Sequence, residues 1–207
     1  MKKLNLVLIL ILLVATSFNN SKWHAAPDKI ATAFTADSLL SYVSTKSGSE
    51  LHNNYFIKEG SYYAIVGKLY ALNKPHLYNS QGLRVFMVPD ESCGTTILLP
   101  SFSTNLDDYK IEVADTLSKL LNALQLISTE HINREWPTAV LYWSKSVGLA
   151  KEDHVFLWEQ AFLRRFEGRI NIVKVNTDVN STWTADAQQK TLGTIQKLLD
   201  IISATES

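Results

Sequence analysis

Cysteine is almost missing from this 207-residue sequence, which contains Cys93 and no other. One cysteine cannot form a disulfide within the chain, so the fold must be held together by its hydrophobic core. Hydrophobic residues make up 46% of the sequence and aromatic residues 10%. That composition predicts a packed globular domain and excludes a disordered chain.

An excess of one charge is also missing, because the sequence has 20 basic and 20 acidic residues. A protein without a basic excess has no general attraction for phosphates, so we predict no nucleic-acid partner. The histidines show none of the spacings of metal ligands, and we predict no metal and no cofactor. The Gly-x-Ser-x-Gly motif of serine hydrolases and the glycine-rich phosphate-binding motifs are absent as well.

Long apolar runs are absent outside the N-terminus. There, Lys2 and Lys3 precede a mainly apolar stretch, residues 4–15, and small polar residues follow it. This order is typical of a secretory signal, and the stretch is shorter than the roughly 20 residues that a transmembrane helix needs. We expect residues 1–17 to be cleaved, which leaves an exported protein, periplasmic or extracellular, without a stable membrane span. An uncleaved anchor is the alternative.

Residues 18–34 lack periodicity and are predicted to be a mobile lead-in to a single α/β domain, residues 35–207. No stretch rich in proline, glycine or serine divides that domain. In its N-terminal half, hydrophobic spacing and turn residues predict a helix at 37–43, a hairpin of strands 55–57 and 62–66, a turn at 79–82, a strand at 83–88 and a helix at 111–127.

The C-terminal half carries a clearer pattern. Residues 138–143 and 170–175 are nearly continuous apolar strands, as expected when both faces of a sheet are covered. A helix at 153–166 separates them, and Thr184 opens a last helix. Two strands joined by a helix form a βαβ unit, whose strands lie parallel and whose crossover is right-handed. We therefore predict an α/β fold: a mixed sheet with a right-handed βαβ unit at 138–175.

Parts of this unit resemble thioredoxin-like proteins. Residues 137–144, Pro-Thr-Ala-Val-Leu-Tyr-Trp-Ser, resemble the strand that leads into the active site of that family, and residues 167–178 resemble the strand that follows. The resemblance covers residues 137–178 only, and it implies a thioredoxin-like or related three-layer architecture. Any further strands of such a fold must come from earlier in the chain, or the fold is incomplete at its C-terminal end.

The two cysteines of that family are not present. Ser144, Lys145, Ser146 and Val147 stand where the family carries Cys-x-x-Cys. Dithiol chemistry needs one thiol with a lowered pKa and a second thiol that resolves the mixed disulfide. The resemblance therefore implies a redox-inactive protein, with Ser144, Lys145 and Ser146 as candidate binding residues.

Cys93 leaves a second interpretation open. Residues 77–93 resemble, more weakly, the approach to a reactive cysteine in redoxins, and the sequence Cys-Gly-Thr-Thr at 93–96 has threonine in place of the second cysteine. One alternative is a thiol enzyme with Cys93 as its catalytic residue. The other is a buried, inert cysteine at the end of a strand.

Tryptophan is the most informative of the aromatic residues. Trp143 and Trp158 fall in apolar patterns and are predicted core residues. Trp136 and Trp183 flank the ends of strands, where exposed rings would suit a partner surface or a ligand cleft. The alternative for both is packing against the edge of the sheet.

Together these features predict an exported, redox-inactive thioredoxin-like protein that acts as a binding or assembly factor in the cell envelope. Its expected partner is another envelope or secreted protein. Two alternatives stay open: a one-cysteine thiol enzyme that uses Cys93, and a secreted binding module of an unrelated α/β fold. The candidate binding residues are Trp136, Ser144, Lys145, Ser146 and Trp183.

Overall fold

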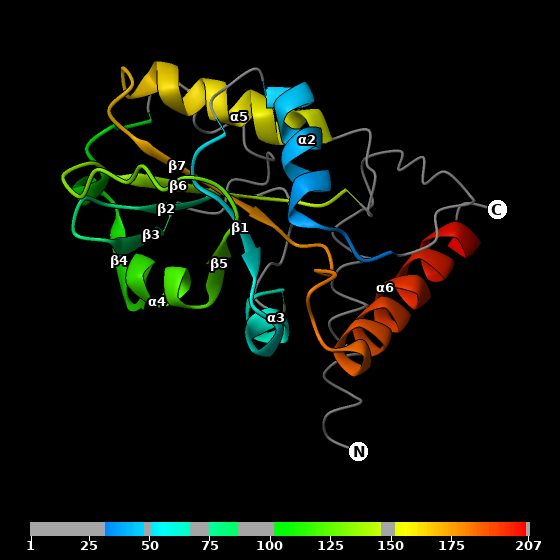
Figure 1. Cartoon of the computed structure of the whole chain (residues 1–207). Helices are drawn as coiled ribbons and strands as arrows, with labels where there is room; N and C mark the ends of the chain where they lie inside the picture. Colours follow the sequence, from blue (N-terminus) through cyan, green and yellow to red (C-terminus); the bar gives the residue numbers. More distant parts are fainter. Residues whose placement is uncertain (1–31, 48–50, 67–74, 87–101, 146–151, 206–207) are drawn as a thin grey trace.

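The computed structural model describes residues 32–47, 51–66, 75–86, 102–145 and 152–205. Seven strands form one mixed sheet in the order β4-β3-β2-β6-β7-β1-β5 (Figure 1). The strands are β1 (Asn54–Ile57), β2 (His76–Tyr78), β3 (Leu83–Phe86), β4 (Lys110–Thr116), β5 (Leu124–Leu126), β6 (Thr138–Trp143) and β7 (Asn171–Asn176). The α-helices are α2 (Ala36–Ser47), α3 (Tyr62–Val66), α4 (Leu117–Asn122), α5 (Glu152–Arg165) and α6 (Ala185–Thr205).

The centre of the sheet is formed by β6, β7 and β1, which run parallel to one another. β6 and β7 pair along their whole length, from Thr138 opposite Asn171 to Trp143 opposite Asn176, and α5 connects them. The predicted parallel pair and its connecting helix are therefore confirmed. Every residue of both strands is buried, as their nearly continuous apolar sequence requires.

Helices cover both faces of this sheet. On one face, α2 and α5 pack over alternate strand residues, Leu141 and Ile172 among them. On the other face, α3, α4 and α6 pack over the residues that point the opposite way, including Val140 and Val173. Figure 1 shows α2 and α5 on one side of the strands and α3 and α4 on the other. The fold is thus α/β with three layers, and its core consists of two hydrophobic clusters separated by the sheet.

The predicted hairpin of 55–57 and 62–66 is wrong. Residues 55–57 lie in β1, but β1 pairs with β5 and β7, which come from far along the chain. A 3-10 turn, Glu59–Ser61, follows β1 and leads directly into the short helix α3. An apolar run of five residues fits a helix as well as a strand, and tertiary contacts decide between them here. Tyr62 is buried and its hydroxyl donates to the carbonyl of Thr177 at 3.1 Å.

The predicted helix at 111–127 is also wrong. The segment divides into the edge strand β4, the short helix α4 and the strand β5. The change occurs at Thr116, whose Oγ1 accepts a hydrogen bond from the Lys119 amide and so caps the start of α4. Within α4, Leu117, Leu120 and Leu121 keep the helical spacing, whereas Val113 is 74% exposed on β4 and Leu124 lies in β5. A regular apolar spacing across three elements therefore resembles that of one helix.

A hairpin does form nearby, between β2 and β3. The predicted turn at 79–82 joins these strands, with Gly82 in the left-handed region at φ +73°. The Asn79 Oδ1 accepts hydrogen bonds from the amides of Gln81 and Leu83, which fixes the turn. β2 then pairs antiparallel with β6, so this hairpin extends the central sheet on one side.

Candidate functional site

The carboxyl ends of β6 and β7 place the residues that follow them side by side. Ser144 and Lys145 follow β6, and Asp178 lies two residues beyond the end of β7. The Ser144 hydroxyl donates to Asp178 Oδ1 at 2.6 Å, and the Lys145 amide donates to Oδ2 at 2.7 Å. Asn176 Nδ2 also donates to Oδ2, at 2.8 Å. Two of the sequence-predicted binding residues thus meet at one carboxylate.

Asp178 is 1% exposed, so its charge must be stabilised by neighbours rather than by water. The three hydrogen bonds from Ser144, Lys145 and Asn176 supply that stabilisation. The Asp178 amide donates in turn to Asn176 Oδ1 at 3.0 Å. The turn after β6 is therefore fixed to the turn after β7 by a buried polar network.

Tyr62 closes this network from the helix α3. Burial raises the pKa of the Tyr62 phenol, and the negative charge of Asp178 adds to the effect, so the hydroxyl stays protonated. As a protonated group it donates to the Thr177 carbonyl. Trp183 packs edge-to-face on the Tyr62 ring, with 5.3 Å between the ring centroids. Trp183 is buried, so this predicted binding residue lies behind the network and not on an open surface.

The Lys145 side chain continues the site toward the N-terminal segment. Its ammonium lies 5.0 Å from the centroid of the Phe34 ring and 5.5 Å from that of Tyr42, in cation–π geometry. Phe34 is held there by a backbone hydrogen bond to the Val179 carbonyl. The Lys145 side chain is half-buried, and its charge remains at the carboxyl edge of the sheet.

Trp136 lies at the opposite edge. It precedes β6, and the six residues of that strand separate it from Ser144 by roughly 20 Å. There it lines an open groove of about 450 Å³ together with Arg165, Phe166 and Arg169. The predicted binding residues therefore do not form one site: Ser144 and Lys145 belong to the carboxyl edge, and Trp136 to the amino edge.

Two further predicted site residues, Cys93 and Ser146, lie outside the described residues, as does the leader 1–17. Asp178, which organises the carboxyl edge, was not among the predicted residues. Its position could have been inferred, because the carboxyl ends of neighbouring parallel strands meet at one edge of the sheet and Asp178 lies two residues beyond the second strand.

No known protein family, curated protein or solved structure matches this chain. Within the described part of the chain, no three or more His, Cys, Asp or Glu side chains gather as a metal site would require. The described helices include none that is both long enough and apolar enough to cross a membrane.

Proposed function

We propose that this chain is an exported, thioredoxin-like protein that lacks dithiol activity and acts by binding another envelope or secreted protein. The observation that carries the proposal is the hydrogen bonding of Ser144 and Lys145 to Asp178. These residues stand where the resemblance places the reactive dithiol. Neither has a sulfur atom, and a buried carboxylate beside them would disfavour a thiolate by like-charge repulsion.

The arrangement of the sheet supports the thioredoxin-like part of the proposal. If the fold is thioredoxin-like, either the strands beside the βαβ unit come from earlier in the chain or the fold is incomplete at its C-terminal end. The β2–β3 hairpin fits the first case, because it precedes β6 in the sequence and pairs with it in the sheet. Export is proposed from the leader, residues 1–17, whose cleavage would leave the domain free to meet an envelope or secreted partner.

The partner surface that we propose is the carboxyl edge around Lys145. Beneath it, the Ser144 hydroxyl, the Lys145 amide and the Asn176 side chain all donate to Asp178, which suits a fixed recognition surface better than a reaction centre. Lys145 presents a positive charge between the Phe34 and Tyr42 rings, so a partner with a carboxylate or an acidic patch would complement it.

Affinity capture tests this proposal, with the purified chain as bait and the envelope and secreted fractions of the producing cells as the source. We expect a captured protein that is lost with Lys145→Glu. Lys110→Glu is the matched control, because it makes the same charge change at an exposed position on the edge strand β4. Circular dichroism verifies that both variants are folded. Failure to capture any protein, or equal capture by Lys145→Glu, contradicts the proposal.

A further inference from the structure

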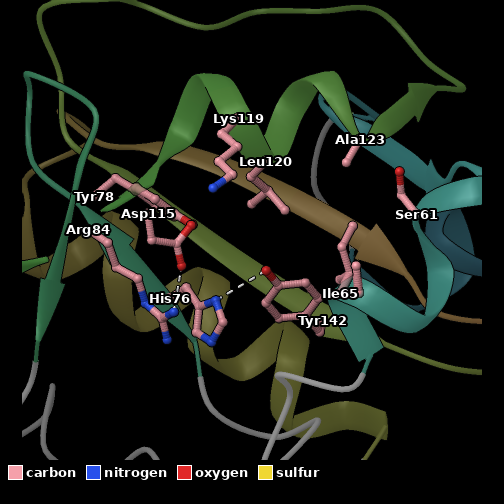
Figure 2. A pocket seen from close by; sticks show the side chains of 11 residues that line it. Ser61, Ile65, His76, Tyr78, Arg84, Asp115, Lys119, Leu120, Ala123 and Tyr142 are labelled. Carbon is pink, nitrogen blue, oxygen red and sulfur yellow. Dashed lines mark hydrogen bonds and ion pairs between the residues drawn. The ribbon is translucent and has the colours of Figure 1, made fainter. Parts of the chain in front are cut away.

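A cavity of about 140 Å³ lies between the sheet and the helices α3 and α4 (Figure 2). His76 from β2, Arg84 from β3 and Tyr142 from β6 form the wall on the sheet side. Ile65 from α3 and Leu120 from α4 form the opposite wall. The cavity is separate from the carboxyl edge, because it lies over the face of the sheet beside the β2–β3 hairpin.

The cavity has one charged end and one apolar end. Figure 2 shows Arg84, Asp115 and the Lys119 ammonium at the first end, and Ile65 and Ala123 at the second. The apolar end is formed by hydrocarbon side chains, with the hydroxyl of Ser61 at its margin. A ligand that fits both ends must be amphipathic.

Hydrogen-bond donors exceed acceptors at the charged end. Among the described residues, Arg84 donates only to Asp115 Oδ2, at 2.7 Å, and Glu112 lies 3.9 Å away. Lys119 forms no ion pair with any residue that the structure describes. A guanidinium carries five N–H donors and an ammonium three, so most donors at this end lack an acceptor among the residues that the structure describes. The Arg84 side chain is only 21% exposed, which makes a ligand acceptor more valuable there than at the open surface.

His76 adds an uncharged polar group to the same end. Burial lowers the pKa of His76 to about 3, and the Arg84 guanidinium contributes to that shift, so the imidazole is neutral at pH 7. Its Nδ1 lies 3.2 Å from the Tyr142 hydroxyl, which leaves the other ring nitrogen for a ligand or water. The imidazole therefore adds no charge to the balance that Arg84, Lys119, Asp115 and Glu112 set.

We propose that this cavity binds a small organic monocarboxylate with a compact apolar body, about the size of benzoate. A cavity of roughly 150 Å³ is known to hold a benzene ring, so 140 Å³ accommodates one six-membered ring. With the ring between Ile65 and Leu120, the carboxylate reaches toward Arg84 and Lys119, and the planar guanidinium matches a carboxylate in geometry. This ligand site goes beyond the proposed partner surface and does not depend on it.

Isothermal titration calorimetry on the purified chain tests the proposal with three probes: benzoate, its uncharged analogue benzyl alcohol, and the cation benzylamine. We expect benzoate to bind at least tenfold more tightly than either of the others. Ala123→Leu fills the apolar end and should abolish the binding. The proposal is overturned if benzoate shows no saturable binding or binds no more tightly than benzyl alcohol. Tighter binding of benzylamine than of benzoate overturns it as well.

Charge variants locate the carboxylate. Arg84→Gln and Lys119→Gln should each weaken benzoate binding at least fivefold, whereas Arg164→Gln, an exposed change on the other face of the sheet, should leave it unchanged. Lys119 is exposed, so its variant decides the question even if Arg84→Gln fails to fold. Unchanged affinity in Lys119→Gln, or an equal loss in Arg164→Gln, contradicts the proposed orientation.

Discussion

At the scale of single residues, the least expected contact is an ion pair inside the core. Lys174 lies in the middle of β7 and is 1% exposed on its side chain, and Glu159 of α5 is 5% exposed. The Lys174 ammonium donates to Glu159 Oε1 at 2.9 Å. When two opposite charges are buried together, their attraction offsets the free-energy cost of removing them from water. A single buried charge has no such compensation.

Breaking this pair should therefore destabilise the fold strongly. We expect Lys174→Met alone to lower the free energy of unfolding by about 3–5 kcal/mol, because the buried Glu159 carboxylate loses its ion-pair partner Lys174. The double variant Lys174→Met/Glu159→Leu should regain most of the loss. Urea unfolding of the wild type, both single variants and the double variant measures the coupling; additive losses would show that the two charges do not interact.

His76 makes a prediction about pH. Its pKa is lowered to about 3 in the folded chain, against about 6.5 in an unfolded one. As pH falls below 6.5, His76 binds a proton in the unfolded state but not in the folded state. The free energy of unfolding therefore decreases between about pH 6.5 and about pH 3. The slope of this decrease is at most about 1.4 kcal/mol per pH unit for one group.

His76→Gln removes that contribution. The variant should lose less unfolding free energy than the wild type between pH 7 and pH 4, as measured by urea titrations at each pH. Arg84, Asp115 and Tyr142 surround this position in both proteins, so the difference between the two pH profiles isolates the contribution of His76. Parallel pH profiles for the two proteins would mean that His76 is not buried as a neutral imidazole.

At the scale of elements, two glycines can be compared: one closes the end of α5, and the other lies within α6. Gly168 follows α5 at φ +77°, and its amide donates to the Leu163 carbonyl at 2.8 Å, which closes the helix. Gly193 lies within α6, and an added Cβ meets no atom within 4 Å at either position. An added methyl group therefore meets no steric clash at either glycine, and the two positions differ only in backbone conformation.

The two Gly→Ala variants should have opposite effects. Gly168→Ala places alanine in the left-handed region and should cost about 1 kcal/mol. Gly193→Ala improves the helix propensity of α6 and should stabilise the protein by about 0.5–1 kcal/mol. Thermal unfolding of both variants compares them directly, and a loss in Gly193→Ala would mean that α6 is not helical at this residue.

The elements that the sequence predicts well are those whose pattern is long and whose contacts are local. Residues 138–176 read correctly as strand, helix and strand, because both strands are apolar throughout and α5 has one apolar face. α3 and β4 could not be predicted in the same way. The first depends on the contact of Tyr62 with Thr177, and the second on pairing with β3. Both contacts join distant parts of the chain.

The same distinction applies to the sites. Ser144 and Lys145 could be predicted, because they directly follow a recognisable strand. The cavity beside His76 and Arg84 could not, since its lining comes from four strands and two α-helices and no single segment carries its signature. Asp178 lies between these cases: its location follows once β6 and β7 are known to be parallel neighbours.

At the scale of the whole molecule, the three parallel strands end at one edge, and acidic residues there hold the structure together. Asp178 fixes the turn after β6, as described above. Glu59, after β1, accepts hydrogen bonds from the Thr184 amide and hydroxyl at 3.0 and 2.8 Å, and so anchors the start of α6. The amide bond chiefly, and the hydroxyl bond next, lower the pKa of Glu59, which keeps it ionised. This edge of an α/β sheet often carries a ligand site, yet here its described polar groups largely bind one another.

We propose that this protein has no dithiol activity, and insulin reduction tests that proposal most directly. The purified chain and its Cys93→Ser variant are assayed with dithiothreitol as the reductant, beside a thioredoxin control. We predict that neither protein accelerates the precipitation of insulin above dithiothreitol alone, because a dithiol cycle needs two thiols and the chain has one. Turnover comparable with the thioredoxin control in either protein would contradict the proposal. If that turnover were lost in Cys93→Ser, the result would instead indicate a thiol enzyme that uses Cys93.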